Sequence, residues 1–209
     1  MDNRALVKPL LLVGSSDDDL RDFPAAARRA AGFELSAVQT GLMPSDFKPI
    51  ATVGPGAYEI RVHVEGEWRV IYVAKFARAV SALHGFRKKT LQDSTGRHRN
   101  RQSPLRASQG GREMSKPKMT AGSGNVFADL GFSPEEASLL KMRADLMNEL
   151  RQVIEARGWT QVAAARELGI SQSRVSDLVR GKWQQFSLDM LVTLAVRAGR
   201  QVNVGLVAG

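Results

Sequence analysis

The segment Gly158–Lys182 constrains the fold of the chain most strongly, because its sequence, GWTQVAAARELGISQSRVSDLVRGK, carries the signals for two short helices joined by a sharp turn. Thr160 and Ser171 are suited to cap the two helices. Gly169 provides the turn between them, and Gly181 ends the second helix. The apolar side chains expected to fill the angle between the helices are Val162, Ala163, Ala164, Leu168, Val175, Leu178 and Val179. This pattern predicts a helix-turn-helix.

The same residues resemble the helix-turn-helix of the repressor-type (XRE, Cro/CI-like) family. They match its pattern T-Q-x-x-A-A-x-x-L-G-I-S-Q-x-x-V-S-x-L-x-x-G almost position for position. An ordinary helical hairpin would explain the caps and the apolar residues, but not the glutamines at both helix starts, where the family makes phosphate and base contacts. The resemblance implies binding to operator DNA by a homodimer that reads two half-sites.

The second helix is expected to carry the side chains that read the DNA. Gln172 is suited to adenine and Arg174 to guanine or phosphate, whereas Gln161 and Lys182 should hold the DNA backbone. The full set of expected DNA-binding residues is Gln161, Ser171, Gln172, Ser173, Arg174, Ser176 and Lys182. Asp177 is expected to be free on the same helix.

The net charge of +9 is concentrated in one part of the chain. Residues 85–119 hold ten Lys or Arg against two Asp or Glu, whereas residues 1–84 hold ten of each and residues 120–209 hold ten against nine. The segment 85–119 is rich in Ser, Gly, Arg and Gln and poor in apolar residues, which argues against a packed core. We therefore expect an N-terminal domain at residues 1–91, a basic flexible linker at 92–119 and a helical domain at 120–209.

Several classes of site are excluded or not indicated by composition. The chain contains no Cys, which excludes disulfides, Cys-type zinc sites and a thiol nucleophile. No apolar run approaches the roughly 20 residues of a membrane span, and acidic residues follow the N-terminus too soon for a secretory signal. We expect a cytoplasmic chain with no membrane contact, cofactor or metal.

The N-terminal domain shows signals for both helices and strands, and we expect an α+β fold. Residues 9–13 suit a strand, Ser15 or Ser16 starts a helix, and a second helix runs from Pro24 to Gly41. Period-two patterns then predict strands at 58–64, 68–73 and 79–86 that form a small antiparallel sheet. A three-residue loop at 65–67 would set Val64 opposite Trp68 and leave Arg61 and Arg69 together on the other face.

Motifs throughout this domain resemble the phage-derived HigB-like (Gp49-like) toxins of the RelE/ParE superfamily. They read KPLLLVGSS, DLRDFP, GFELSAVQTG, DFKPIATVGPGAYEIRV, WRVIYVAKF and ALHGFRKKT, and residues 124–209 likewise resemble a HigA-type antitoxin. The resemblance implies a small RelE-like sheet and an endoribonuclease that cuts mRNA, usually on the ribosome. It also implies an antitoxin that inhibits the nuclease and represses its own operon.

Cleaving RNA without a metal uses the 2′-hydroxyl as nucleophile, so positive charge must stabilise the transition state and titratable groups must move protons. At the family's motif positions we assign Arg61 and Arg69 to phosphate stabilisation, because Arg presents a planar fork of donors. Lys48 and Lys89 are candidates for RNA contact or proton transfer, and His84 titrates near neutrality in its unperturbed state.

Structural roles would also explain some of these residues. The two arginines could lie on a solvated sheet face, paired with Glu59 and Glu67, and His84 could pack as an ordinary strand residue. The N-terminal domain would then be a sensor or oligomerisation unit of a transcription regulator, or part of an inert fusion.

The resemblance to the toxins ends just after Lys89, where the charged C-terminal helix typical of the family is replaced by TLQDSTGRHRNRQSPLRASQGGRE. One hypothesis is a frameshift near residues 90–93 that fused two reading frames, with Met114 or Met119 as the former antitoxin start. We expect toxin–antitoxin contact within one chain or between two chains, and the tether would hold the toxin domain inhibited.

The helical domain should contain roughly five helices. Ser133 starts a helix that runs to Arg157, and Ser187 caps a last helix that ends near Arg197. The inward-facing residues expected on these two helices are Leu139, Leu140, Leu146, Leu150, Val153, Ile154, Leu188, Leu191, Leu194 and Ala195. The tail QVNVGLV alternates as a strand would, and is expected to pair with its copy in a second chain or to fold back onto its own domain.

Overall fold

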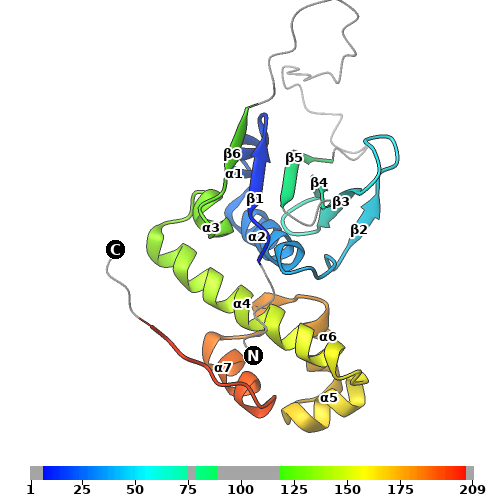
Figure 1. The fold of residues 1–209 in the computed structure, drawn as a ribbon, viewed down its shortest axis with the longest axis vertical. Helices are drawn as coiled ribbons and strands as arrows, with labels where there is room; N and C mark the ends of the chain where they lie inside the picture. The colour runs from blue at the N-terminus through cyan, green and yellow to red at the C-terminus, as the bar shows by residue number, and fades with distance from the viewer. Residues whose placement is uncertain (1–6, 75–78, 89–117, 206–209) are drawn as a thin grey trace, which may run out of the picture.

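The computed structural model describes residues 7–74, 79–88 and 118–205, and it confirms the α+β fold (Figure 1). A sheet with two helices forms one half of the molecule, and a helical bundle forms the other. Most of the predicted linker, together with Lys89, Met114 and the proposed frameshift position, lies outside the described residues.

The sheet has six strands in the order β2-β3-β4-β5-β1-β6. Their bounds are β1 Leu10–Val13, β2 Phe47–Pro49, β3 Ala57–Val62, β4 Trp68–Val73, β5 Val80–Arg87 and β6 Met119–Ala121. The expectation of a purely antiparallel sheet is wrong, because β1 pairs with β5 in parallel. β2 and β6 were not predicted, since three residues are too few to show a period.

Two helices pack with the sheet, and both begin where the sequence predicts. Helix α1 spans Ser16–Arg21 and contacts β5, and α2 spans Ala25–Gln39 and contacts β3. Pro24 precedes the first turn of α2, where its missing N–H is not needed. Of the expected apolar positions, Ala27, Ala31, Leu35 and Val38 are buried and Ala30 is partly buried. This spacing gives α2 one continuous apolar face.

The register between β3 and β4 differs from the prediction by two residues. Val62, not Val64, lies opposite Trp68, and Arg61 lies directly opposite Arg69. The loop therefore has five residues, 63–67, and it includes Gly66 at φ 131°. A shift of two keeps every side chain on its expected face, so the grouping of the arginines is unaffected.

Five α-helices form the described part of the helical half, as predicted. They are α3 Val126–Asp129, α4 Pro134–Ala156, α5 Gln161–Leu168, α6 Gln172–Val179 and α7 Leu188–Arg197, with a short 3-10 helix, η2, at Trp183–Gln185. The predicted caps are present: each side-chain oxygen of Ser133, Thr160, Ser171 and Ser187 accepts a backbone N–H three residues on. Gly169 adopts φ 65° at the turn between α5 and α6.

Some side chains that were predicted to be buried are exposed. Leu139, Val162 and Val179 are 46%, 64% and 36% exposed, because helical spacing marks one face but not how far its neighbours cover it. The predicted tail strand is also absent from the described residues 201–205, where Val204 is 68% exposed. The rest of that tail lies outside the described residues.

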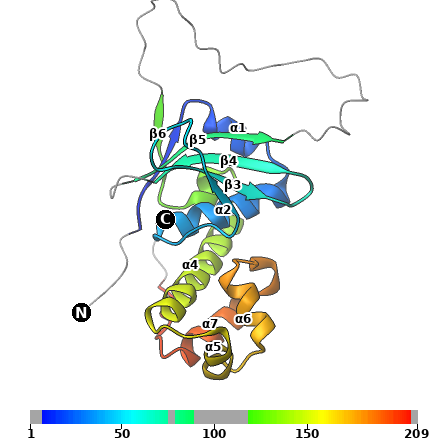
Figure 2. The same ribbon diagram turned by 90° about the vertical axis from the view of Figure 1, so that its right-hand side faces the viewer.

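The two halves share one hydrophobic core. α2 lies between the sheet and α4 (Figure 2), and β6 adds to the free edge of β1. The boundary expected at residues 119 and 120 therefore falls inside a strand of the N-terminal sheet.

Close contacts hold α2 against the helical half. The Phe33 ring stacks on Trp183 of η2 with centroids 4.8 Å apart. A Cβ at Gly32 would lie 2.6 Å from Phe127, so glycine lets α3 approach α2. Asn148 of α4 donates a buried hydrogen bond to Ser36 over 3.1 Å.

Candidate functional site

A polar cleft of about 480 Å³ lies on the N-terminal domain. Its lining residues are Lys48, Pro49, Ile50, Ala51, Thr52, Glu59, Arg61, Arg69, Phe86 and Lys88. Strand register explains the grouping: Lys48 is opposite Glu59, Arg61 is opposite Arg69, and Arg69 is opposite Phe86. Their neighbours Ile60 and Val70 are buried, so the cleft residues occupy the sheet face away from the core.

Three of the five predicted catalytic residues, Lys48, Arg61 and Arg69, line this cleft. Lys89 lies outside the described residues. His84 is not a lining residue: its Nδ1 lies 2.6 Å from a carboxylate oxygen of Asp19 in α1. Its ring stacks on Phe86 with centroids 5.4 Å apart. The structure thus places His84 beside the cleft, behind one of its walls.

The two arginines differ in what they offer to a ligand. Arg69 is only 5% exposed, and its guanidinium donates to Glu67 Oε2 at 2.8 Å and to the Trp68 carbonyl at 2.8 Å. The Arg61 side chain is 33% exposed and donates from Nε to Glu59 over 3.2 Å. Glu59 also lies 3.4 Å from Arg69 Nε. Arg69 therefore anchors carboxylates, and Arg61 is the more accessible cation.

The cleft has a positive balance and one aromatic wall. Lys48, Arg61, Arg69 and Lys88 face a single lining carboxylate, Glu59. Such a surface attracts phosphate by charge, and an exposed aromatic ring gives a base a face to stack on. The pairing with Glu59 and Glu67 expected for a solvated sheet face is also present.

Phe86 and Thr52 were not assigned to the site from the sequence, and Lys88, a cation within the toxin-like motif ALHGFRKKT, was given no specific role. Alternation along β5 could not have identified Phe86, because Val80 and Ala82 face the core and the irregularity after Ala82 moves Phe86 to the other face, opposite Arg69. Thr52 comes from the connection after β2, whose path has no periodic signal.

His63 joins the hairpin loop to the start of β2. Its two ring nitrogens each lie 2.7 Å from a carboxylate oxygen, one of Glu67 and one of Asp46. These hydrogen bonds, with Glu67 first, raise the pKa of His63 above its ordinary value. Because the folded pKa is raised, these hydrogen bonds stabilise the folded chain fully below the unfolded pKa of about 6.5. This stabilisation is lost as pH rises through the folded pKa.

We therefore expect His63→Gln to lower the free energy of unfolding most below pH ~6.5, by less than about 1 kcal/mol because the side chain is half exposed. Above the folded pKa the difference should shrink. Urea titrations of both proteins from pH 5.5 to 8.5 measure it. A difference that grows with pH would contradict the assignment.

The helix-turn-helix presents most of its expected DNA-binding residues to solvent. Gln161, Ser171, Gln172, Ser173 and Lys182 are exposed, and Ser176 is partly buried. These residues lie at or near the starts of α5 and α6, except Ser176 and Lys182, which come later.

Three other side chains of this region are less free than expected. Arg174 donates from Nη1 to the carbonyl and side-chain oxygens of Gln185, at 2.9 and 3.1 Å. Lys182 pairs with Asp177 over 2.7 Å. The expectation that Arg174 and Asp177 are free is wrong, because the 3-10 turn after α6 folds back beside them. DNA contact by Arg174 requires these bonds to be exchanged.

A pair of substitutions separates base reading from backbone contact. Gln172→Ala should change base preference at one position of each half-site, by about 1–3 kcal/mol of discrimination. Lys182→Ala should weaken binding to all sequences similarly and reduce the salt dependence of binding. Fluorescence anisotropy with operator variants at several salt concentrations measures both. A Gln172→Ala protein with unchanged base preference would contradict the assignment.

Comparison with known proteins identifies both halves. Residues 18–101 match the family of phage derived Gp49-like proteins, and residues 126–206 match a helix-turn-helix domain family. A search of curated proteins returned no match. Among the described residues, no helix has the length and apolar character needed to cross a bilayer. The chain therefore joins a Gp49-like domain, of the RelE/HigB-type toxin family, to a helix-turn-helix domain, and it belongs with toxin–antitoxin-like fusions.

Proposed function

We propose that the helix-turn-helix half binds operator DNA and represses its own operon, while the Gp49-like half is an mRNA endoribonuclease that acts on the ribosome. The observation that carries the nuclease part is the cleft, which is lined by the cations Lys48, Arg61 and Lys88 together with Phe86. In this mechanism the 2′-hydroxyl loses its proton and attacks the adjacent phosphate, the P–O5′ bond breaks, and the 5′-oxygen leaves and takes up a proton, giving a 2′,3′-cyclic phosphate. Arg61 and Lys48 stabilise the charge that develops on the phosphate. Lys48 in the cleft and His84 beside it are the candidate groups for proton transfer.

The helix-turn-helix half is proposed to inhibit the nuclease without filling the cleft. None of the described residues 118–205 lines the cleft, and these residues pack on α1, α2 and β1 instead. Inhibition would then act in one of two ways. The bulk of the helical half would prevent the toxin domain from entering a ribosome, or the packing of the helical half would change the shape of the cleft.

One observation favours a second function, a DNA-binding regulator whose N-terminal domain is catalytically inactive. Both cleft arginines are paired with carboxylates, Arg61 with Glu59 and Arg69 with Glu67. These pairs reduce the positive charge available to a phosphate. RNA cleavage separates the two functions.

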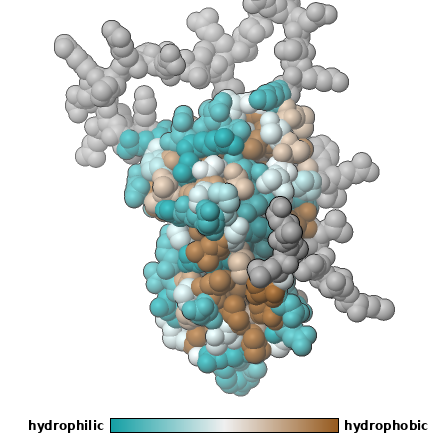
Figure 3. All heavy atoms as spheres, turned by 90° about the vertical axis from the view of Figure 1, so that its left-hand side faces the viewer, coloured by the Kyte–Doolittle hydropathy of each residue, from teal (hydrophilic) through white to brown (hydrophobic). Residues whose placement is uncertain are grey.

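A homodimer is proposed because a repressor-type domain reads two half-sites. The support is an apolar surface on the helical half: Figure 3 shows hydrophobic residues gathered below the sheet domain on this face. Exposed Leu139 and Met142 come from α4, and exposed Val196 comes from α7, which packs against α4. An apolar surface of this kind suits a subunit interface.

Induction of the whole chain in cells, with mapping of mRNA ends, tests the nuclease. Operator binding by the same purified protein tests the repressor. Cleavage with growth arrest supports the toxin function. Operator binding without cleavage by the whole chain fits an inhibited nuclease and the inactive regulator alike, and cleavage by residues 1–92 produced without the helix-turn-helix half then separates the two. Absence of operator binding would refute the repressor role.

A further inference from the structure

The connection between α2 and β2, residues 40–46, leads directly into the cleft. Its last residue, Asp46, accepts a hydrogen bond from the Arg61 backbone N–H at 2.9 Å. The Asp46 carboxylate also lies 3.8 Å from the Arg61 guanidinium. Lys48 follows two residues later in β2, an edge strand of three exposed residues that pairs only with β3. So short an edge strand buries little apolar surface of its own, and its position depends on the contacts that hold the connection before it.

Helix α4 of the helix-turn-helix half holds this connection by its backbone. Gln152 Nε2 donates to the Thr40 carbonyl at 2.9 Å, and Arg151 Nη2 donates to the Met43 carbonyl at 3.0 Å. Both donors come from neighbouring residues on one helix, and both acceptors are 100 or more residues earlier in the chain. A rigid helix from one half thus fixes a loop of the other.

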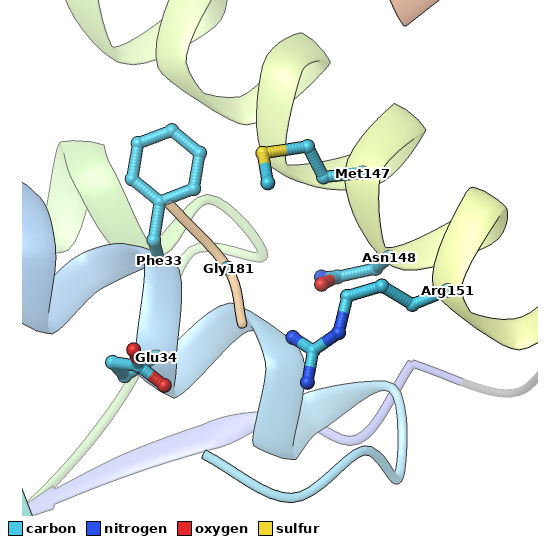
Figure 4. A pocket seen from close by; sticks show the side chains of 6 residues that line it. All are labelled: Phe33, Glu34, Met147, Asn148, Arg151 and Gly181. Atoms are coloured by element: carbon cyan, nitrogen blue, oxygen red, sulfur yellow. The ribbon is translucent and has the colours of Figure 1, made fainter. Parts of the chain in front are cut away.

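A half-buried carboxylate completes the attachment. Glu34 of α2 accepts the Ser45 backbone N–H at 2.8 Å and also the Ser45 hydroxyl. Burial raises the pKa of Glu34, and the positive charge of Arg151 opposes that rise. Figure 4 shows the Arg151 side chain extending from α4 towards α2, where Glu34 lies, with Gly181 beside them. Arg151 therefore holds the connection directly at Met43, and its positive charge also acts on Glu34, which holds Ser45.

We infer that Arg151 and Gln152 are positioning residues for the phosphate-binding cleft: the helix-turn-helix half sets the place of β2, and with it Lys48 and the Asp46–Arg61 pair. The identity of the ligand rests on the proposed nuclease function, but the positioning does not. Docking of the helical half and anion binding in the cleft are consequently coupled, and each changes the equilibrium of the other.

Amide hydrogen exchange of the full chain tests the positioning. In Arg151→Met, the amides of Ser45 and Arg61 should exchange about tenfold faster, because the bonds that hold the connection are lost. Amides of β5, which lies two strands from β3 in the sheet, should keep their rates. Arg166→Met is the matched control, since Arg166 is 81% exposed on α5. Arg151→Lys, which keeps a donor and the charge, should restore most of the protection.

The cleft gives a second readout. Binding of a short single-stranded RNA should be about fivefold weaker in Arg151→Met, because Lys48 and Arg61 are no longer held in place. Unchanged exchange at Ser45, or equal acceleration in Arg166→Met, would overturn the inference. If the wild-type chain binds no RNA, the proposed nuclease function fails, and the exchange of Ser45 still decides the positioning role.

Discussion

Replacement of Phe127 by alanine is expected to lower the free energy of unfolding by about 3–5 kcal/mol. Phe127 is fully buried and carries the contact of α3 with the sheet domain. Its ring meets Phe33 of α2 edge-on, with centroids 5.2 Å apart, and covers Gly32. Removal of the ring leaves a cavity between two halves that share one core. Urea denaturation measures the change.

Two further variants make this test specific. Val162→Ala removes an apolar side chain that is 64% exposed, and it should change stability by no more than about 0.5 kcal/mol. Gly32→Ala should destabilise the wild-type chain, because its Cβ would meet Phe127 at 2.6 Å. In the Phe127→Ala background the same substitution should cost less. Additive effects of the two changes would show that the contact is not the one described.

The sequence predicted the helical half well because its signals are local. A cap residue and a glycine act within a few residues, so Thr160, Ser171 and Gly169 could be assigned without knowledge of the fold. Strand partners are not local. Neither the parallel pairing of β1 with β5 nor the addition of β6 could be derived from a period of two, because a period shows faces and not neighbours.

The candidate site was predicted in part for the same reason. Alternation alone puts Arg61 and Arg69 on one face, and a register error of two residues does not change this. His84 was different, because a bulge between Ile71 and Tyr72 leaves Leu83 without a partner and alters the direction of the chain. The position of His84 against Asp19 follows from that irregularity, which no residue pattern announces.

Substitution of Arg61 by glutamine is expected to reduce RNA cleavage by about 100-fold, with little change in stability. Arg61 is the more accessible arginine of the cleft. Its partner Asp46 is already 42% exposed beside it, and Glu59 keeps Arg69 as a partner without it. Arg69→Gln should behave differently. It removes a buried cation from between Glu59 and Glu67, so a lower unfolding midpoint should accompany any loss of activity.

Single-turnover cleavage of a ribosome-bound mRNA by residues 1–92, which lack the inhibiting helical half, distinguishes the two arginines when it is measured beside urea denaturation of the full chain. The pair of results matters because a fall in activity alone could come from partial unfolding. If Arg61→Gln cleaves RNA at the wild-type rate, Arg61 serves to pair with the carboxylates of the cleft and has a structural role. If Arg61→Gln loses activity while its midpoint is unchanged, the cation acts on the phosphate itself, and Glu59 serves to hold it in place until RNA arrives.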